Sequence, residues 1–539
     1  MSVERNRLEI SHFAVAIGAF GLGAVMAVMQ ALSRADIDVV FRTPKVYYLS
    51  VTAHGVLMAL VFTTFFIMGL GLFVARTTVG GTASERWAWI GFWVAVFGTL
   101  ITTVAILSGT STVLYTFYPP LMAHPAFYIG AALLVIGSWI WSGVMLVTWR
   151  CWRAEHQGPL PLPMHGMVTC VIIWLLATAG LAAEVLGQLI PWSLGWVDKI
   201  DPILARTFFW WFGHPLTYFW LVPAYVLWYT VLPQVAGGRL FSDRLTRVVF
   251  VMFILFSTPV GFHHQFTDPG IDPMWKLVHT VTTYAILFPS MVTAFTVIAS
   301  LEIGGRLRGG RGVFGWIRRL PWKDPFLLSV IFAMLSFTIG GFGGAINAAY
   351  AMNSMVHNTF WIPAHFHVTV GSAVALTFLG ASYWLFPRVV GRELAWPWMA
   401  RLQAITWFVG MMIFSISGHI TGLMGQPRRV YTSNYFGAEQ AGAWEWLTLL
   451  SAVGGVVLFV SSALFLVVMI GSWLVGAPVT GKKPHYARPL DPLPARAGLY
   501  DRFPLWVGIA ILLIVAAYAY PLYELFTMER FGSPGFRPF

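Results

Sequence analysis

The sequence has 539 residues, of which 58% are hydrophobic and only 10% carry a charge. So few charged side chains cannot cover the surface of a water-soluble protein of this length, which excludes a soluble protein and predicts an integral membrane protein. The net charge of +12 does not indicate nucleic-acid binding, because the basic residues lie in short connections between apolar runs and form no single solvated patch.

Apolar runs recur along the whole chain, and each is long enough to cross a hydrocarbon layer of roughly 30 Å, which takes about 20 helical residues. We predict thirteen transmembrane helices and no separate soluble domain, so residues 1–539 form one all-α bundle. The first run exceeds the apolar core of a signal peptide, roughly 7 to 15 residues, and is therefore predicted to be a retained helix. The predicted spans are 11–33, 48–76, 87–109, 125–149, 164–191, 206–233, 245–265, 275–302, 327–350, 362–388, 401–426, 444–475 and 503–526.

The connections between these runs predict the orientation of the bundle. Basic residues fall in alternate connections, and by the positive-inside rule those connections and the N-terminus face the cytoplasm. The two cysteines, Cys151 and Cys170, are too few for a disulfide framework and are predicted to be structural. The basic groups are Arg150 with Arg153, Arg239 with Arg244 and Arg247, the stretch from Arg306 to Lys323, Arg388 with Arg392, and the stretch from Lys482 to Arg502.

Histidines inside the apolar runs are functional candidates, because an ionisable side chain in a hydrocarbon layer is costly. Successive helices run in opposite directions, so residues at one depth must stand alternately early and late in their helices. These histidines do so: four lie near the starts of even-numbered spans, and two lie at the end of the seventh. The six residues predicted to share the outer part of the bilayer are His54, His214, His263, His264, His365 and His367.

Two of these histidine pairs carry geometric information. Residues two apart on an α-helix point to nearly opposite sides, so His365 and His367 can serve two different metal centres. For the adjacent His263 and His264 to reach one metal, the backbone must depart from a regular helix. A proline and a glycine just before the pair, Pro259 and Gly261, make this departure plausible.

The chemistry of the cluster favours haem iron and copper. A lone intramembrane histidine is more often a packing residue than a ligand, but six at one depth change that balance. A hydrolytic zinc site is a poor alternative, since the sequence has no HExxH and no carboxylate beside these histidines. Ligation by imidazole alone suits copper and haem iron.

Tyr218 stands four residues after His214, one helical turn along the same face, so its phenol can reach a metal that His214 holds. A tyrosine in a membrane protein is often an interfacial or packing residue. The neighbouring histidine favours a redox-active phenol at the metal centre instead.

The motifs HPLTY at 214–218, HH at 263–264 and HFH at 365–367, with an early histidine in the second span, resemble subunit I of the haem-copper oxygen reductases. The resemblance covers nearly the whole chain. Three stretches are most similar to the B-family, the ba-type cytochrome c oxidases: RTFFWWFGHPLTYFWLVPAY, STPVGFHHQFTDPGIDPMWK and RLRGGRGVFGWIRRLPW.

The resemblance implies a ligand set and a reaction, the reduction of dioxygen to water coupled to proton uptake and proton pumping. It implies that His54 and His367 bind the iron of a low-spin haem b, and that His365 is the proximal ligand of a high-spin haem, expected to be a-type. The single copper ion is expected on His214, His263 and His264.

The resemblance also implies roles around these metals. Tyr218 is expected to be covalently joined to the His214 ring and to donate an electron and a proton when the O–O bond breaks. Arg428 and Arg429, in QPRRVY after the eleventh span, match a pair that binds haem propionates. Bidentate pairing of arginine with buried carboxylates supports this role, although lipid headgroup contact is the alternative. His357 and Asn353 are expected in the propionate region.

A polar route for protons is predicted in the inner half of the bundle. Tyr218, Tyr225 and Tyr229 lie on one face of the sixth span and descend from the histidine cluster. The antiparallel eighth span carries three hydroxyls at the corresponding depth: Ser290, Thr293 and Thr296. Isolated hydroxyls in membrane helices usually bond to their own backbone, but two converging rows predict a path, and they match the single K-like channel of the B-family.

One departure from the wider family has a consequence. The A-family carries Glu where this sequence has Leu216, so a single proton uptake path is predicted.

A nitric oxide reductase is the nearest rival function, but it uses a non-haem iron helped by glutamates and lacks the tyrosine. A transporter or a haem-based electron conduit is the rival from another class, and neither needs a three-histidine site beside a tyrosine.

The sequence lacks a cysteine-rich dicopper site and a CxxCH motif, so electrons must enter through a partner. Expected partners are a subunit II with a dicopper site, cytochrome c as donor, membrane lipids and a small single-helix subunit. A quinol donor remains an alternative. The expected location is the cytoplasmic membrane of a bacterium or archaeon.

Overall fold

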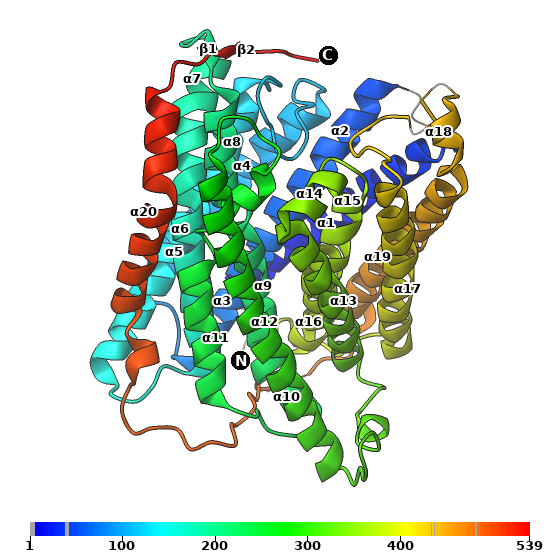
Figure 1. The fold of residues 1–539 in the computed structure, drawn as a ribbon. Coiled ribbons are helices and arrows are strands. Elements are labelled where there is room, and N and C mark those ends of the chain that lie inside the picture. The colour runs from blue at the N-terminus through cyan, green and yellow to red at the C-terminus, as the bar shows by residue number, and fades with distance from the viewer. Residues whose placement is uncertain (1–5, 38–42, 433, 436, 480–481, 539) are drawn as a thin grey trace.

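The computed structural model describes residues 6–37, 43–432, 434–435, 437–479 and 482–538. These residues form a bundle of long, tilted helices, which confirms the predicted fold class (Figure 1). We call the end of the bundle at which α1 (Arg7–Arg34) begins the lower end and the opposite end the upper end, as drawn in Figure 1. The first five residues, part of the predicted N-terminal connection, lie outside the described residues.

Among the described residues, twelve spans are long and apolar enough to cross a membrane. Several are divided by a π-helical segment or a proline and therefore carry two or three labels. The twelve are α1; α2 (Pro44–Gly55), η2 (Val56–Phe62) and α3 (Thr63–Thr78); α4 (Glu85–Leu107); α5 (Pro125–Glu155); α6 (Leu162–Glu184), η3 (Val185–Leu189) and α7 (Ile190–Ser193); α8 (Pro202–Gly213), α9 (Pro215–Thr230) and α10 (Leu232–Val235); α12 (Pro273–Leu307); α13 (Pro325–Ala348); α15 (Trp361–Phe366), η6 (His367–Val374) and α16 (Ala375–Val389); α17 (Pro397–Leu423); α19 (Glu445–Val475); and α20 (Phe503–Thr527).

Short elements connect these spans. A two-stranded antiparallel sheet pairs Ile200 with Ser533, so the C-terminal tail lies across the upper end of the bundle (Figure 1). The short elements are β1 (Lys199–Ile200), η4 (Gly261–Gln265), η5 (Ile317–Arg319), α14 (Tyr350–Val356), α18 (Glu439–Gly442), η7 (Leu499–Asp501) and β2 (Ser533–Pro534).

The predicted seventh helix, 245–265, is wrong as a continuous span. Here α11 (Asp243–Phe256) ends after 14 residues, and the chain continues through a non-helical stretch into the 3₁₀ turn η4. Pro259 provides no backbone N–H for a helix, and Gly261 leaves room for a close approach by neighbouring side chains. The departure from regular helix that we predicted at this proline and glycine is therefore confirmed.

Helix starts follow a repeated sequence signal, a short polar N-cap residue followed by proline at the first helical position. Asp201 caps α8, and its carboxylate accepts hydrogen bonds from the N–H groups of Ile203 and Leu204. Asp272 and Asp324 cap α12 and α13 in the same way. These caps satisfy backbone donors that a helix cannot satisfy internally.

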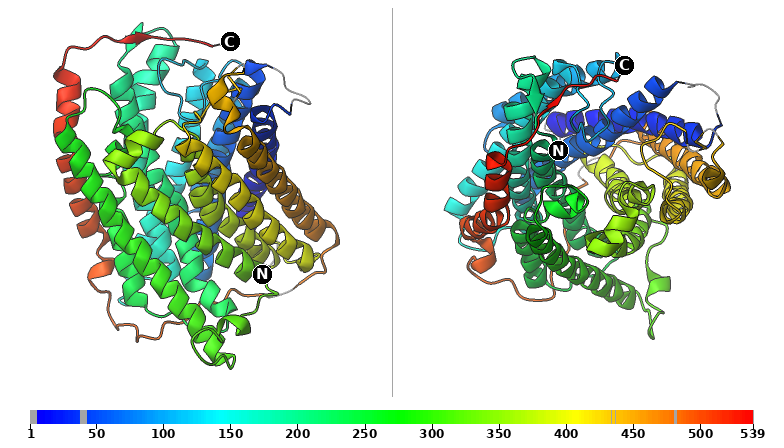
Figure 2. Two further views of the ribbon diagram at one scale, coloured as in Figure 1. Left: turned by 45° about the vertical axis from the view of Figure 1, so that its right-hand side comes forward. Right: turned by 45° about the horizontal axis from the view of Figure 1, so that its top comes forward.

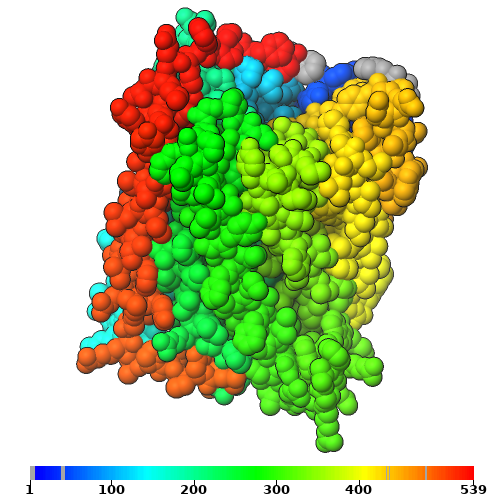
Figure 3. All heavy atoms as spheres, viewed as in Figure 1, coloured from blue at the N-terminus to red at the C-terminus, as the bar shows by residue number. Residues whose placement is uncertain are grey.

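Burial separates central from peripheral helices. In the most apolar stretch of the α8–α10 span, 94% of residues are buried, whereas the corresponding fraction is 28% for α1 and for α20. The α8–α10 span therefore lies in the core, and α20 lies at the edge of the bundle beside α11 and α12 (Figure 2, Figure 3). The connection between α12 and α13, which carries the predicted basic stretch, projects beyond the lower end.

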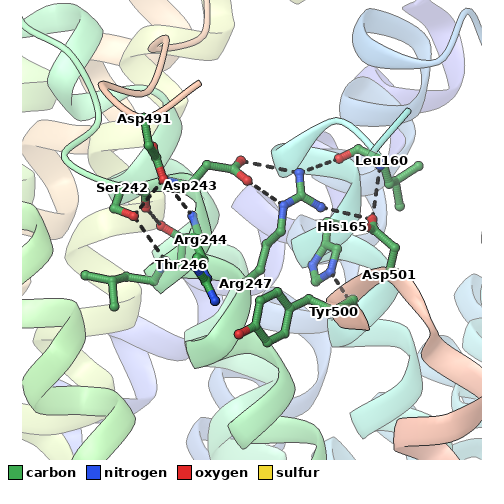
Figure 4. A network of polar contacts seen from close by, with 11 residues as sticks. Leu160, His165, Ser242, Asp243, Arg244, Thr246, Arg247, Asp491, Tyr500 and Asp501 are labelled. Carbon is green, nitrogen blue, oxygen red and sulfur yellow. Dashed lines mark hydrogen bonds and ion pairs between the residues drawn. The ribbon is translucent and has the colours of Figure 1, made fainter. Parts of the chain in front are cut away.

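A buried ion network joins distant segments at the lower end (Figure 4). Arg247 of α11 pairs with Asp243 at 2.6 Å and with Asp501 at 3.0 Å, and it donates a hydrogen bond to the Leu160 carbonyl. Asp501 in turn accepts the Leu160 N–H. The network ties the connections that precede α6 and α20 to the start of α11.

Candidate metal centres

Three histidines from two segments meet in the upper half of the bundle. His214 lies between α8 and α9, and His263 and His264 lie on η4. Their candidate ligand nitrogens all lie within 4.8 Å of one another, and Nδ1 of His214 is 3.0 Å from Nε2 of His264. Three neutral imidazoles at this spacing can hold one copper ion.

Neighbours orient the rings of this triad. Trp210 stacks on His264 with a centroid distance of 3.7 Å and an interplanar angle of 1°. The hydroxyl of Thr283 donates to the His279 carbonyl, so it accepts from Nδ1 of His263 at 2.9 Å. That bond leaves Nε2 of His263 free for a metal.

Tyr218 lies within reach of the triad, as predicted. Its hydroxyl is 2.9 Å from Nε2 of His214, and Nδ1 of the same ring faces His264. One imidazole therefore contacts both a phenol and the metal-binding position.

His54 and His367 face each other although 313 positions separate them in the sequence. Their rings are parallel within 2°, with centroids 6.1 Å apart. Each Nδ1–H donates to a carbonyl, that of Gly23 for His54 and that of Pro363 for His367. Both Nε2 atoms stay free, and the gap accommodates one metal with bonds of about 2 Å to each ring. Two parallel imidazoles of this kind would be able to hold a haem iron.

His365 points away from this pair, as its spacing from His367 predicts. Its ring stacks on Trp361 and lies so close to α13 that a Cβ on Gly343 would be 2.5 Å from its Nδ1. The chain changes from α15 to the π-helical η6 at His367. A second π-helical segment, η2, begins one residue after Gly55, beside His54, and such segments often mark functional sites.

One continuous cavity of about 700 Å³ connects these groups. All six predicted ligand histidines line it, together with Tyr218. The cavity walls are largely apolar, with a few convergent polar groups, as is typical of cofactor sites.

Positive charge gathers at the upper mouth of this cavity. Arg428 donates to the Asn358 side chain at 3.0 Å, and Arg429 donates to the Tyr115 hydroxyl at 3.3 Å. Burial, together with neighbouring Arg429, lowers the pKa of Arg428 to about 10. Arg206, which sequence reasoning missed, also lines the cavity and pairs with Asp268 at 3.0 Å.

The two weaker propionate-region predictions lie at the same mouth. His357 lines the cavity, and burial together with Arg428, Arg206 and Arg429 lowers its pKa to about 4, so it is neutral at pH 7. Asn353 also lines the cavity, and its buried Oδ1 has no hydrogen-bond partner in the structure. An excess of arginine over carboxylate at this mouth fits an anionic group such as a haem propionate.

Below the triad, the two predicted hydroxyl rows meet. The Tyr229 hydroxyl lies 2.5 Å from that of Thr293, and the Tyr225 ring packs against the Tyr229 ring. Ser290 lines the cavity, whereas the buried hydroxyl of Thr296 has no hydrogen-bond partner among the described residues. Ser300, one turn beyond Thr296, donates its hydroxyl to the Thr296 carbonyl and accepts the Phe241 N–H, so its bonds are to backbone groups.

Three comparisons with known proteins agree. The family model described as cytochrome c and quinol oxidase polypeptide I matches residues 7–457. Cytochrome c oxidase subunit 1 of Thermus thermophilus is 40% identical over 94% of this chain and 92% of its own length. The probable quinol oxidase subunit 1 of Staphylococcus haemolyticus is 25% identical over 88% and 71%. A heme-copper terminal oxidase dimer solved by cryo-electron microscopy superposes with a TM-score of 0.94 at 36% identity, over 99% of this chain and 95% of the other.

Fold and site together define a multi-span membrane oxidoreductase with a three-imidazole cluster that could hold a metal. The chain belongs to the cytochrome c and quinol oxidase polypeptide I family. This family membership implies haems and copper, and the residues present fit both: a three-imidazole cluster for copper, and a pair of parallel imidazoles with an arginine-rich mouth for haem.

Proposed function

We propose that this chain is the catalytic subunit of a terminal respiratory oxidase that reduces dioxygen to water with electrons from cytochrome c. The observation that carries the proposal is the single cavity, because six imidazoles and one tyrosine from separate helices converge on it. Neither a transporter nor an electron conduit requires a three-histidine cluster beside a phenol.

The proposed ligand set is the one that the family resemblance implies, and the ring geometry supports it. His54 and His367 hold the low-spin haem b, and His365 holds the high-spin haem, expected to be a-type. When bound, the haem irons and copper supply the electron transfer and the site at which dioxygen is reduced. The proposed copper ligands are His214, His263 and His264.

Tyr218 is the proposed source of an electron and a proton at the reduction site. The 2.9 Å approach of its hydroxyl to His214 supports this role, and the family resemblance adds a covalent bond between the two side chains. Because the phenol lies deep in the bundle, it must be reprotonated through protein groups and not directly from bulk water.

The chain's own hydroxyls form the proposed route for these protons. The proposed route comprises Tyr225 and Tyr229 on α9 with Ser290, Thr293 and Thr296 on α12, and the bond between Tyr229 and Thr293 bridges the two helices. Leu216 stands where a second path would need a carboxylate, so one path serves both chemistry and pumping.

The arginine-rich mouth is the proposed anchor for the haem propionates. Arg428 and Arg429 direct guanidinium groups to the cavity, with His357 and Asn353 beside them. Propionates would offset a positive charge that is otherwise buried at a cost.

The finer assignments rest on sequence resemblance and on the 40% identity with the Thermus protein. We propose a B-family, ba-type enzyme in the cytoplasmic membrane of a bacterium or archaeon, with its N-terminus and its lower end facing the cytoplasm. A subunit II with a dicopper site would deliver electrons, and a small single-helix subunit would complete the complex.

Metal analysis of the purified chain, freed of partners, tests the proposal first. Two iron atoms and one copper atom per chain are expected from the ligand set. About three iron atoms and no copper would overturn the proposal in favour of nitric oxide reduction. Turnover of the whole complex with reduced cytochrome c, compared with a quinol, separates the two electron donors.

A further inference from the structure

The break after α11 leaves backbone groups without helical partners inside the bundle. Where a helix ends within a membrane protein, each freed N–H and C=O must find another partner, because hydrocarbon offers none. The groups concerned belong to the turn of residues 258–262, immediately before His263 and His264. Two bonds form within the segment, from the Val260 N–H to the Thr258 carbonyl and from the His263 N–H to the Val260 carbonyl. Side chains from α12 and α20 satisfy several of the other groups.

His279 of α12 holds one of these groups. Its Nδ1 accepts the N–H of Phe262 at 3.2 Å, and its Nε2–H donates to the Ala517 carbonyl of α20 at 3.2 Å. An N–H donor on one side and a carbonyl acceptor on the other define a neutral ring with its proton on Nε2. The ring is fully buried, so bulk water does not reach either bond.

Tyr518 of α20 holds two further groups of the turn, and the Thr282 hydroxyl of α12 donates to the Pro259 carbonyl. Its hydroxyl accepts the Gly261 N–H at 3.2 Å and donates to the Thr258 carbonyl at 3.4 Å. The approach is so close that a Cβ on Gly261 would be 2.4 Å from the phenol oxygen. This contact gives a direct reason for glycine at that position.

Packing reinforces the hydrogen bonds. The Phe262 ring stacks on His279 with centroids 4.2 Å apart and meets the Tyr518 ring edge-on at 5.2 Å. On the other side of the turn, Trp210 stacks on His264. The turn that presents the two histidines is therefore clamped between α8 and the pair formed by α12 and α20.

We propose that His279 and Tyr518 are positioning residues that hold the 258–262 turn in the shape that brings His263 and His264 to the same copper as His214. The inference rests on the proposed copper site. Neither residue belongs to the ligand cluster, and both act through the backbone that carries the ligands. Removing a group that hydrogen-bonds a metal ligand lowers metal affinity about 10- to 100-fold, and we expect a comparable loss when the turn that carries two ligands is released.

The test compares variants of the complete oxidase complex by copper affinity and by haem spectra. Tyr518→Phe removes one oxygen and keeps the ring, and His279→Leu removes the acceptor for Phe262. His279→Asn is the conservative variant, because its Oδ1 can accept the Phe262 N–H. Tyr523→Phe, on the exposed side of the same helix α20, is the matched control.

Copper affinity is measured by competition with a chelator, and the copper-to-iron ratio and the low-spin haem absorption are recorded on the same samples. We expect about a 10- to 100-fold loss of copper affinity in Tyr518→Phe and His279→Leu, with both haems retained. His279→Asn should recover most of the loss, and Tyr523→Phe should match the parent.

Unchanged copper affinity in both Tyr518→Phe and His279→Leu would overturn the inference. Loss of haem in step with copper in Tyr518→Phe would also overturn it, since the residue would then support the whole bundle. If the parent complex itself contains no copper, the proposed function is wrong. The copper content of the parent therefore tests the function, and the variants test the inference.

Discussion

At the residue scale, the central contact joins a phenol and an imidazole in one turn of helix. The four-residue spacing of His214 and Tyr218 brings Oη within 2.9 Å of Nε2, and the other ring nitrogen stays on the metal side. The position of Tyr218 follows from helix geometry and could be predicted from the sequence. Trp210, four residues before His214, was not recognised, because its partner is His264 on another segment.

Tyr218→Phe should reduce oxygen consumption by at least about 100-fold, because a positioned proton donor contributes roughly 10²–10⁴-fold to a rate. Copper and iron contents should stay at parental values, since the phenol is not a ligand. Oxygen uptake driven by reduced cytochrome c, together with metal analysis, measures both. Tyr383→Phe is the control, because Tyr383 is buried and bonds to Gln403 away from the cavity. Turnover above a tenth of the parental rate in Tyr218→Phe would contradict the proposed role.

Thr293→Val should slow turnover by about tenfold or more, because it removes the hydroxyl that bridges Tyr229 and α12 while keeping the side-chain shape. The rate of proton uptake, followed with a pH-indicator dye during a single turnover, should fall in parallel. Thr280→Val on the same helix removes a hydroxyl that bonds only to its own helix backbone, and it should leave both rates unchanged. Equal rates in the two variants would exclude this route.

At the element scale, apolar runs predict where helices lie but not where they change form. The predicted bounds of most spans lie within a few residues of the observed ones, because twenty apolar residues in a membrane have few alternatives. The π-helical segments at Val56 and His367 depend on contacts with other helices, so no local pattern predicts them. The break before His263 had a local signal, Pro259 and Gly261.

Arg247 shows how contacts from two connections hold the start of helix α11 in place. Its guanidinium bonds to Asp243, Asp501 and the Leu160 carbonyl, and both carboxylate side chains are nearly inaccessible to water (Figure 4). Arg247→Met leaves two buried carboxylates unpaired, so we expect a loss of about 3–5 kcal/mol in stability, seen as a lower thermal unfolding midpoint in detergent.

The control for Arg247→Met is an exposed ion pair at the same end of the bundle. Lys482 and Glu393 lie 3.4 Å apart with 41% and 49% of their side chains exposed. Lys482→Ala should therefore cost about 0–1 kcal/mol. A shift of the midpoint as large as that of Arg247→Met would show that burial does not decide the effect.

At the scale of the whole molecule, the site unites residues that lie far apart in the chain. Alternating helix direction predicts the common depth of the six histidines, but depth alone does not say which helices are neighbours. The pairing of His54 with His367 and the contact of His279 and Tyr518 with the copper-ligand turn depend on lateral packing across the bundle. Arg206 was missed for the same reason, since its relation to the cavity appears only in three dimensions.

The separation of the two centres gives a prediction for the assembled protein. His367→Ala removes one of the two parallel imidazoles. The complex should therefore lose one of the two proposed irons, together with the low-spin haem absorption. Copper should stay at one per chain, because the triad and the residues that orient it lie on other helices. Metal analysis and the absorption spectrum of the reduced complex measure both quantities.

The control is His12→Ala. His12 is a buried histidine that does not line the cavity, so this variant should keep all three metals. Loss of copper together with iron in His367→Ala would show that the centres assemble as one unit, and the assignment of His54 and His367 to a separate haem would then have to be abandoned.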